Sequence, residues 1–304
     1  MRRLFFALTL VMASFGLSQL VAQERPIGPP PALLIVREEI KPGQMPAHNR
    51  HSASFAKIFA RLQTNNYRIA MVPIAGNENE VLYITPVGTF AELERMQQDT
   101  DKKMGAATGA TRAELGRLEK EAPDLHAGMR DLFAVHRPEM GYDPVVDIAT
   151  MRYFAITTVR IRPGMEDEYV EYIRTLTNVA RQKAKAELHI AAFQVIAGAP
   201  TAAGPTYMFF RPMKSISDYD LRTGPRTREA MTDDQKKKAD KMNGEIVLNS
   251  ETSVYAFVPQ MSYVPKEMAA RDAAFWNPKT EETATPGRTP RKPRNKNSTT
   301  GNPQ

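Results

Sequence analysis

One phrase occurs twice in this chain, and its spacing constrains the fold more than any other feature of the sequence. The segments HRPEMGYDP (136–144) and FVPQMSYVP (257–265) share the pattern Pro-x-Met-x-Tyr-x-Pro, and each matching residue lies 121 positions from its counterpart. A fixed spacing of this kind is typical of an internal repeat, which has to be recognised before single elements are assigned. We therefore interpret the chain as two copies of one unit.

The segments before this phrase recur in the same order. LLIVREEIKPG (33–43) and FAITTVRIRPG (154–164) predict strands that end in a Pro-Gly turn, again 121 residues apart. In each copy an amphipathic helix follows, then two strands joined by a turn, then helical sequence, and finally the repeated phrase, which we interpret as the last strand. Each copy therefore predicts the order β-α-β-β-α-β.

Four strands with helices on one face leave the other face of the sheet apolar and uncovered. Packing that face against a second sheet of the same kind buries it. We therefore predict an α+β fold in which two ferredoxin-like repeats, residues 32–145 and 151–266, pack their antiparallel sheets into one intramolecular, pseudo-dimeric α/β barrel.

The strand-Pro-Gly-helix openings IKPGQMPAHNRHSASF and IRPGMEDEYVEYIRTL, with the element order, resemble the dimeric α/β-barrel superfamily, and within it the antibiotic-biosynthesis-monooxygenase-like and NIPSNAP-like families. The resemblance covers about residues 32–266. It implies a fold rather than an activity, because members include cofactor-independent monooxygenases, haem-degrading enzymes, haem-binding peroxidases and proteins with no known activity. The Asn, Trp and His set of the haem-degrading members has no match here, since the only tryptophan, Trp276, lies outside both repeats. We predict no cofactor, and haem is the alternative that the resemblance leaves open.

The beginning of the chain has the composition of a targeting segment. Residues 1–23, MRRLFFALTLVMASFGLSQLVAQ, combine a charged start with an apolar run, the layout of a secretory signal peptide. An uncleaved membrane anchor is the alternative. No cysteine is present, which excludes disulfides and thiol chemistry. We predict an exported protein, periplasmic or extracellular, with no integral membrane segment after signal cleavage.

The basic charge of the chain is concentrated at its ends. There are 41 Lys and Arg against 34 Asp and Glu, but two of the basic residues lie in the expected signal peptide and five lie in residues 285–304, which contain no acid. The remaining body is neutral, which argues against a nucleic-acid partner. Because the end of the chain is rich in Pro, Gly, Asn and Thr, we predict that residues 275–304 form a disordered basic tail.

His48 and His51 form the most chemically distinctive pair in the sequence. Three residues apart on a predicted helix, they lie on one face, so both imidazoles could point at one atom. No Asp, Glu or His stands at an obvious spacing to supply a third ligand, so we predict no metal site. The two histidines are instead candidates for catalysis in a cavity, with a purely structural place at the end of the core stripe as the alternative.

Four tyrosines are further candidates for the lining of a ligand cavity. Tyr169 and Tyr172 take the places of the two histidines in the second copy, and Tyr142 and Tyr263 belong to the repeated phrase. A phenol can donate a hydrogen bond to a bound carbonyl or quinone, although buried tyrosines more often anchor packing. No phosphate-binding glycine loop, His-Glu-x-x-His motif or nucleophile elbow occurs in the sequence.

We predict that the protein binds a small apolar or aromatic molecule in a cavity between sheet and helices, as a monomer or weak homo-oligomer. One alternative is a cofactor-independent monooxygenase that acts on a phenol or quinol, with His48, His51 or a tyrosine as the base. Another is a non-catalytic scaffold that makes contacts through its basic tail. The His-to-Tyr difference between the copies indicates that one of two equivalent cavities is used. Ligand and reaction are not specified by the sequence.

Overall fold

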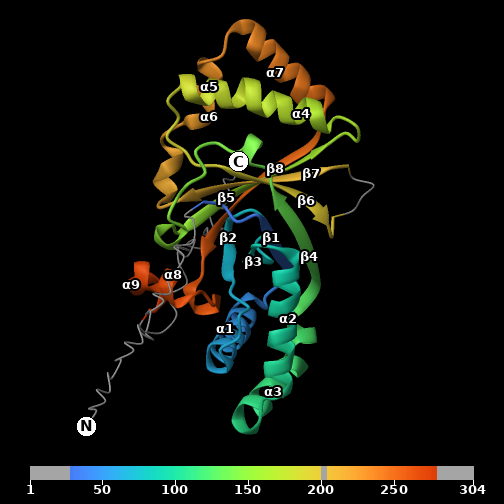
Figure 1. The fold of residues 1–304 in the computed structure, drawn as a ribbon, viewed down its shortest axis with the longest axis vertical. Coiled ribbons are helices and arrows are strands. Elements are labelled where there is room, and N and C mark those ends of the chain that lie inside the picture. The colour runs from blue at the N-terminus through green and yellow to red at the C-terminus, as the bar shows by residue number, and fades with distance from the viewer. Residues whose placement is uncertain (1–27, 200–203, 279–304) are drawn as a thin grey trace, which may run out of the picture.

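The computed structural model describes residues 28–199 and 204–278 (Figure 1). The expected signal peptide and most of the expected tail lie outside these residues. The described strands form one closed antiparallel barrel in the order β1-β3-β2-β8-β5-β7-β6-β4. The strands are β1 (Ala32–Ile40), β2 (Ile69–Ala75), β3 (Glu80–Val87), β4 (His126–His136), β5 (Tyr153–Ile161), β6 (Ala191–Ala197), β7 (Thr206–Met213) and β8 (Val247–Phe257).

Helices connect these strands on the outside of the barrel. The α-helices are α1 (Met45–Leu62), α2 (Phe90–Gly105), α3 (Gly109–Leu125), α4 (Glu166–Tyr172), α5 (Asn178–Lys183), α6 (Thr223–Glu229), α7 (Asp233–Glu245), α8 (Lys266–Arg271) and α9 (Ala273–Trp276). The short helical turns are η1 (Pro138–Met140), η2 (Ile148–Thr150), η5 (Ile216–Tyr219), η6 (Pro259–Met261) and the π-helical turn η3 (Ile173–Thr177). Within the described residues, no helix is both long and apolar enough to cross a membrane.

The barrel has two sides that follow the order of the chain. Strands β1 to β4 are neighbours in the barrel, as are β5 to β8, and the ladders β2–β8 and β4–β6 join the two groups. Helices α1 to α3 cover one side and α4 to α7 the opposite side (Figure 1). The prediction of an α+β fold whose antiparallel strands close into a barrel is confirmed.

An apolar core fills the inside of the barrel. Side chains alternate between the two faces of a strand, so Leu33 and Ile35 of β1 point inward while Leu34 contributes to a cluster outside with α2 residue Leu93. Every strand contributes to the inner core, which includes Met71, Leu82, Leu132, Phe154, Phe193, Phe210 and Phe257. The inside is therefore mainly apolar packing, and the Tyr255 hydroxyl of this core donates a hydrogen bond to Glu80, which also pairs with Arg37.

The repeated phrase does not form the last strand of either half, and this prediction was wrong. β4 ends at His136 and β8 ends at Phe257, and the phrase continues as the turns η1 and η6. Proline fixes φ and lacks the N–H that a ladder needs, so it suits the first position of a helical turn instead. The methionines of the phrase, Met140 and Met261, are fully buried under these turns.

The tyrosines of the phrase return the chain to the barrel. Tyr142 forms a single antiparallel bridge with Ile190, just before β6, and Tyr263 forms one with Arg68, just before β2. Each phrase therefore ties the end of one half to a strand of the other half.

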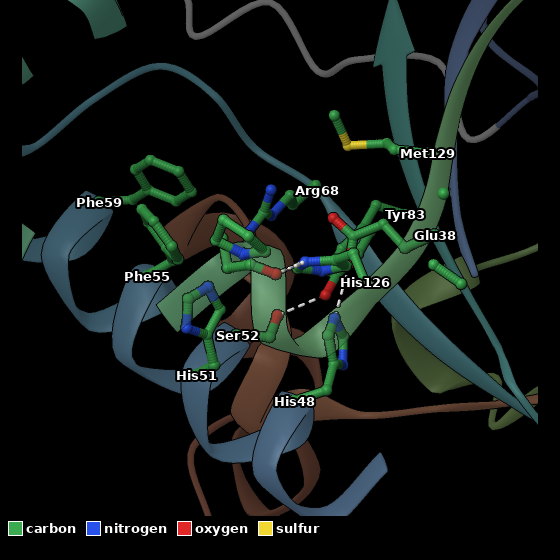
Figure 2. Close-up of a pocket in the computed structure, with 14 residues that line it drawn as sticks. Glu38, His48, His51, Ser52, Phe55, Phe59, Arg68, Tyr83, His126 and Met129 are labelled. Carbon is green, nitrogen blue, oxygen red and sulfur yellow. Dashed lines mark hydrogen bonds and ion pairs between the residues drawn. The ribbon is translucent and has the colours of Figure 1, made fainter. Parts of the chain in front are cut away.

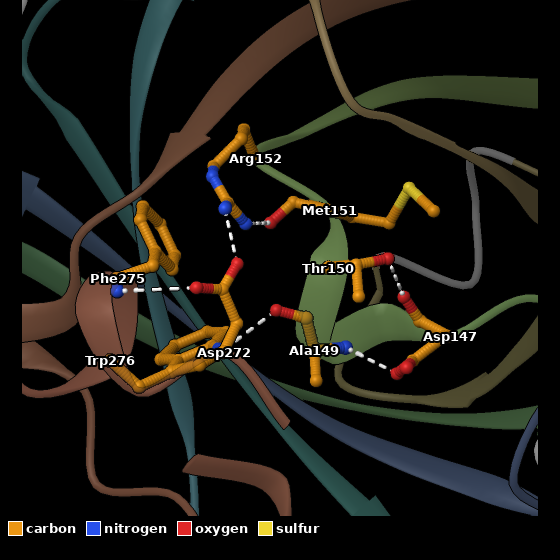
Figure 3. A network of polar contacts seen from close by, with 8 residues as sticks. All are labelled: Asp147, Ala149, Thr150, Met151, Arg152, Asp272, Phe275 and Trp276. Atoms are coloured by element: carbon orange, nitrogen blue, oxygen red, sulfur yellow. Dashed lines mark hydrogen bonds and ion pairs between the residues drawn. The ribbon is translucent and has the colours of Figure 1, made fainter. Parts of the chain in front are cut away.

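Helices α8 and α9 pack against the inner core, and Figure 3 shows the contacts of Asp272 and Trp276 with the segment 147–152. The Trp276 indole is buried against the inner core and donates a hydrogen bond to the Ala149 carbonyl at 2.8 Å. Asp272 pairs with Arg152, whose guanidinium lies 4.0 Å from the centre of the Phe275 ring. We expected the disordered tail to begin at residue 275, and this was wrong for Phe275 and Trp276, because their burial offsets the cost of ordering the chain.

We predict that Trp276→Ala lowers the free energy of unfolding by about 3–5 kcal/mol, since it removes a buried aromatic side chain and leaves the Ala149 carbonyl unpaired. Chemical denaturation followed by circular dichroism measures the change. Val145→Ala, at an exposed position, serves as the control and should change stability by no more than about 0.5 kcal/mol. Equal stability of the two variants would contradict the role given to α9.

Candidate functional site

A cavity of about 480 Å³ lies between helices α1 and α3 and the helix-facing side of the sheet (Figure 2). Its wall combines charged and polar groups with aromatic rings. The lining residues are Glu38, His48, His51, Ser52, Phe55, Phe59, Arg68, Tyr83, Ala122, Pro123, His126, Ala127, Gly128 and Met129. The cavity thus lies between the sheet and the helices, where the sequence analysis predicted a ligand cavity.

Helix α1 supplies one wall of the cavity through its spacing. His51 and Ser52 each lie three or four residues from both His48 and Phe55, and Phe59 follows four residues later, so the five share one face of the helix. The helix begins after a Pro-Gly turn and carries proline in its first turn, where the missing N–H costs nothing. The first turns of α1 therefore present both histidines toward the sheet.

Glu38 of β1 supplies a carboxylate opposite this helix. Its side chain is 14% exposed, and Oε2 lies 2.7 Å from His48 Nε2 and 3.3 Å from His126 Nε2. Burial alone would raise the pKa of Glu38, but the hydrogen bonds from His126 and His48 outweigh burial and lower this pKa to about 2. The carboxylate is therefore ionised at neutral pH.

His126 stands where α3 ends and β4 begins. Its Nδ1 lies 2.8 Å from the Ala122 carbonyl oxygen in the last turn of α3, and its Nε2 faces Glu38. The hydrogen bond with Glu38 raises the pKa of His126 above its ordinary value, against an opposing effect of burial. The ring also contacts that of His48 edge to face, with centroids 5.1 Å apart.

His51 does not join His48 on a common atom. Its Nδ1 faces Glu121 of α3 at 3.7 Å, whereas His48 faces Glu38. Burial lowers the pKa of His51, so its neutral form predominates at neutral pH. Both catalytic candidates from the sequence thus line the cavity, but they contact different carboxylates.

Arg68 and Tyr83 form the other polar side of the cavity. The Arg68 guanidinium carbon lies 4.4 Å from the centre of the Tyr83 ring and 4.9 Å from that of Phe59. Its Nε is buried and has no hydrogen-bond partner among the described residues. The Tyr83 hydroxyl shares a hydrogen bond with Ser52, and burial raises the pKa of Tyr83, which therefore stays neutral.

None of the four tyrosine candidates is among the residues that line this cavity, although Tyr263 lies beside it, with its ring 6.2 Å from that of Phe59. Tyr169 and Tyr172 are buried under α4 on the other side of the barrel, where Tyr169 packs against Tyr207 at 5.6 Å between ring centroids. Tyr263 stacks on Tyr67 at 5.0 Å and donates a hydrogen bond to the Thr64 carbonyl. Tyr169, Tyr172 and Tyr263 are thus held in packing contacts, which the sequence analysis gave as the alternative to lining a ligand cavity.

Tyr142 lies on the second side of the barrel as well, beside a buried cation. Arg181 of α5 is 5.9 Å from the centre of its ring and forms a 2.7 Å hydrogen bond with Asn178 Oδ1. Burial lowers the pKa of Arg181 to about 10, which still leaves it charged at neutral pH.

The sequence reasoning missed Glu38, His126 and Arg68, none of which stands at a helical spacing from His48 or His51. The expectation of no metal site rested on the lack of a third ligand at a suitable spacing, and in the fold Glu38 and His126 both reach His48. One signal was present for Glu38. It is a carboxylate on the strand face whose neighbours, Val36 and Ile40, are apolar.

The arrangement can act in three ways. Glu38 paired with an imidazole can take up or release a proton, and Arg68 can bind an anionic group. One donor atom each from Glu38, His48 and His126 lies within 4.8 Å of the others, so the three could also hold a cation. Haem would use only one of these imidazoles as its proximal ligand, so the convergence of three donors suits a single metal ion better than a haem iron.

We predict that Glu38→Gln lowers the pKa of His126 toward or below its ordinary value, because the largest cause of the upward shift is removed. Titration of the histidine ring resonances by NMR in metal-free buffer measures this pKa. Glu121→Gln, which contacts His51 instead, should leave it unchanged. A His126 pKa that stays raised in Glu38→Gln would show that the carboxylate does not control this ring.

No family model matches the chain, and no curated protein does. Among solved structures, an anthrone oxidase-like protein is 9% identical, with a TM-score of 0.47 over 75% of this chain and 91% of its own. A chlorite dismutase variant from Candidatus Nitrospira defluvii is 8% identical, with a TM-score of 0.45 over 80% of this chain and 95% of its own. Likeness at this level says nothing of function.

Proposed function

We propose that this protein binds a small aromatic molecule with an anionic oxygen in the cavity between α1, α3 and the sheet. The observation that carries the proposal is Arg68, whose guanidinium lies against two aromatic rings in the cavity wall and forms no ion pair with any described residue. Arg68 is half-buried and its buried Nε has no hydrogen-bond partner among the described residues, so an anionic ligand would supply the missing partner.

The aromatic part of the ligand has a matching surface. Phe55 and Phe59 of α1 face the cavity with their rings 6.1 Å apart, and Met129 lies across from them (Figure 2). Aromatic pairs in offset or edge arrangements add about 0.5–1.5 kcal/mol beyond the burial of area. A single ring carrying a carboxylate or phenolate suits this combination of apolar wall and cation.

The chain is, in the proposed reading, two ferredoxin-like repeats that form a pseudo-dimeric barrel. Two register observations support this reading. The ladder between β1 and β4 shifts between Glu39 and Ile40, and that between β5 and β8 shifts between Arg160 and Ile161, 121 residues later. The partner of Ile40 is His126 and that of Ile161 is Val247, again 121 apart.

The offset of 121, which becomes 122 at Arg68, pairs four polar residues of the cavity with apolar or aromatic ones. The counterpart of Glu38 is Val159, that of His126 is Val247 and that of His48 is Tyr169. Arg68 forms a bridge with Tyr263 and Ile190 forms one with Tyr142. Because these are the tyrosines of the two phrases, Ile190 is the counterpart of Arg68. We therefore propose that only the first repeat carries a functional cavity, and that its counterpart is packing.

Export and oligomeric state complete the proposal. The n-region and apolar run of residues 1–23 support secretion, to the periplasm or beyond. In the two-repeat reading the chain already contains both halves of the barrel, so no second chain is needed to close it. This supports a monomer or a weak homo-oligomer.

We predict that benzoate binds the protein and that benzamide, its neutral counterpart of similar shape, binds less tightly. Arg68→Gln should weaken benzoate binding about tenfold to a hundredfold, the value of hydrogen bonds to a charged group, and leave benzamide binding unchanged. Ligand-observed NMR with the purified protein measures both affinities. Arg95→Gln, at an exposed arginine of α2, is the matched control. Equal benzoate affinity in Arg68→Gln and wild type would exclude Arg68 as the anion site.

A truncated chain separates cavity binding from a scaffold that acts through its tail. Removal of residues 279–304, which keeps α9 intact, should leave the benzoate affinity unchanged because no residue of the cavity is removed. Removal from residue 275 would also delete Trp276, so loss of binding in that shorter chain would report on stability instead. Loss of benzoate binding in the chain ending at residue 278 would favour the tail as the site of contact.

A further inference from the structure

Three side chains from separate parts of the chain converge in the wall of the cavity. Glu38 comes from β1, His48 from the first turns of α1 and His126 from the start of β4, and one donor atom of each lies within 4.8 Å of the others. We propose that Glu38, His48 and His126 bind one divalent first-row transition metal ion, such as Zn²⁺ or Fe²⁺, with an exchangeable position toward the cavity.

The separations suit coordination to a single ion. Around a tetrahedral metal with bonds of about 2.0–2.1 Å, neighbouring ligand atoms lie about 3.3 Å apart. Glu38 Oε2 and His126 Nε2 are 3.3 Å apart, and Glu38 Oε2 and His48 Nε2 are 2.7 Å apart. A widening of the second distance by about 0.6 Å therefore gives the spacing of a metal site.

The hydrogen bond that His126 forms through its other ring nitrogen also supports a metal site. Nδ1 donates to the Ala122 carbonyl at 2.8 Å, which leaves the lone pair of a neutral ring on Nε2, directed at Glu38. A lone pair facing a carboxylate is repelled unless a proton or a cation lies between them. Metal-bound histidines ordinarily donate their other N–H to a backbone carbonyl or carboxylate in this manner.

The surroundings favour a cation at this point. The Ala122 carbonyl belongs to the last turn of α3, and the carboxyl end of a helix carries partial negative charge. The Glu38 carboxylate, whose side chain is 14% exposed, adds a full negative charge, and interactions between partly buried charges are stronger than those in water.

The donor set selects the kind of metal. Two imidazoles and one carboxylate suit zinc and the redox-active first-row metals, whereas Mg²⁺ and Ca²⁺ prefer sites made of oxygen alone. Three protein ligands leave at least one position for water or another ligand. That this position receives the anionic oxygen of an aromatic ligand is the one element of the inference that rests on the proposed function.

The second side of the barrel offers an internal control for stoichiometry. At the offset of 121 residues, the positions of the three donors are occupied by Val159, Tyr169 and Val247. Valine has no donor atom, and Tyr169 is packed among aromatic rings. One metal ion per chain is therefore expected.

The test is binding of Co²⁺ to the chelator-treated full chain, prepared without a histidine tag. The expected result is one Co²⁺ per chain by elemental analysis, visible d–d absorption bands of a protein-bound ion, and displacement by Zn²⁺. Glu38→Gln and His126→Asn should each weaken binding by more than the roughly 10–100-fold that loss of an outer hydrogen-bond partner costs. Glu38→Gln keeps the side-chain shape, and circular dichroism verifies that each variant is folded.

Two variants serve as matched controls. His189→Asn removes a histidine that pairs with a single carboxylate, that of Asp143, and Tyr169→Phe changes the position equivalent to His48. Both should bind Co²⁺ as the wild type does. Affinity weaker than about 1 mM in the wild type, or equal affinity in Glu38→Gln and wild type, would overturn the metal site and leave a hydrogen-bonded His–Glu cluster.

Adding benzoate to the Co²⁺-bound protein separates this inference from the proposed function. A change in the d–d bands with benzoate that is lost in Arg68→Gln supports both. If benzoate binds elsewhere on the protein and the d–d bands stay unchanged, the ligand does not coordinate the metal. That outcome would overturn this coordination and leave the metal site itself in place. Bound Co²⁺ with no benzoate affinity would overturn the proposed ligand class and leave the metal site in place.

Discussion

Alternation of side chains along the strands decides where this molecule can carry chemistry. In a closed barrel one face of every strand points inward, and here that face is filled by Leu33, Ile35 and their neighbours from every strand. The cavity lies on the other face, which the helices cover. Glu38 occupies this face on β1, with His48 and His126 around its carboxylate.

A carboxylate under a helix is costly unless other groups compensate for the water that it loses. Here the compensation comes from two imidazoles, one on α1 and one at the end of α3, and their hydrogen bonds lower the pKa of Glu38 despite its burial. The position of α1 therefore matters beyond packing, because His48 must reach β1. The Pro-Gly turn before α1, with Gly43 at a φ of 80° that favours glycine, fixes the short path from strand to helix.

The sequence predicted the barrel because periodic patterns are local. The strand pattern of 33–43, the helical spacing of His48, His51 and Phe55, and the offset of 121 residues can each be read without knowing the fold. The repeated phrase was misread as a strand because its apolar alternation resembles one, whereas its prolines begin helical turns. The site was predicted only in part, since the contacts of His48 with Glu38 and His126 depend on strand register and on the end of α3. Neither of these can be read from the spacing of residues in the sequence.

The difference between the two sides of the barrel has a physical rationale in the proposed two-repeat reading. A cluster of Glu, two His and an unpaired Arg weakens the packing between helix and sheet, because each group must be satisfied rather than simply buried. On the other side the same places hold Val159, Tyr169, Val247 and Ile190, which need no partners or only one. Since ladders β2–β8 and β4–β6 join the two sides into one barrel, the apolar side can stabilise the polar one. Two chains of identical sequence could not divide the roles in this way, because every change would appear on both sides, whereas a tandem chain can keep one side for packing and the other for chemistry.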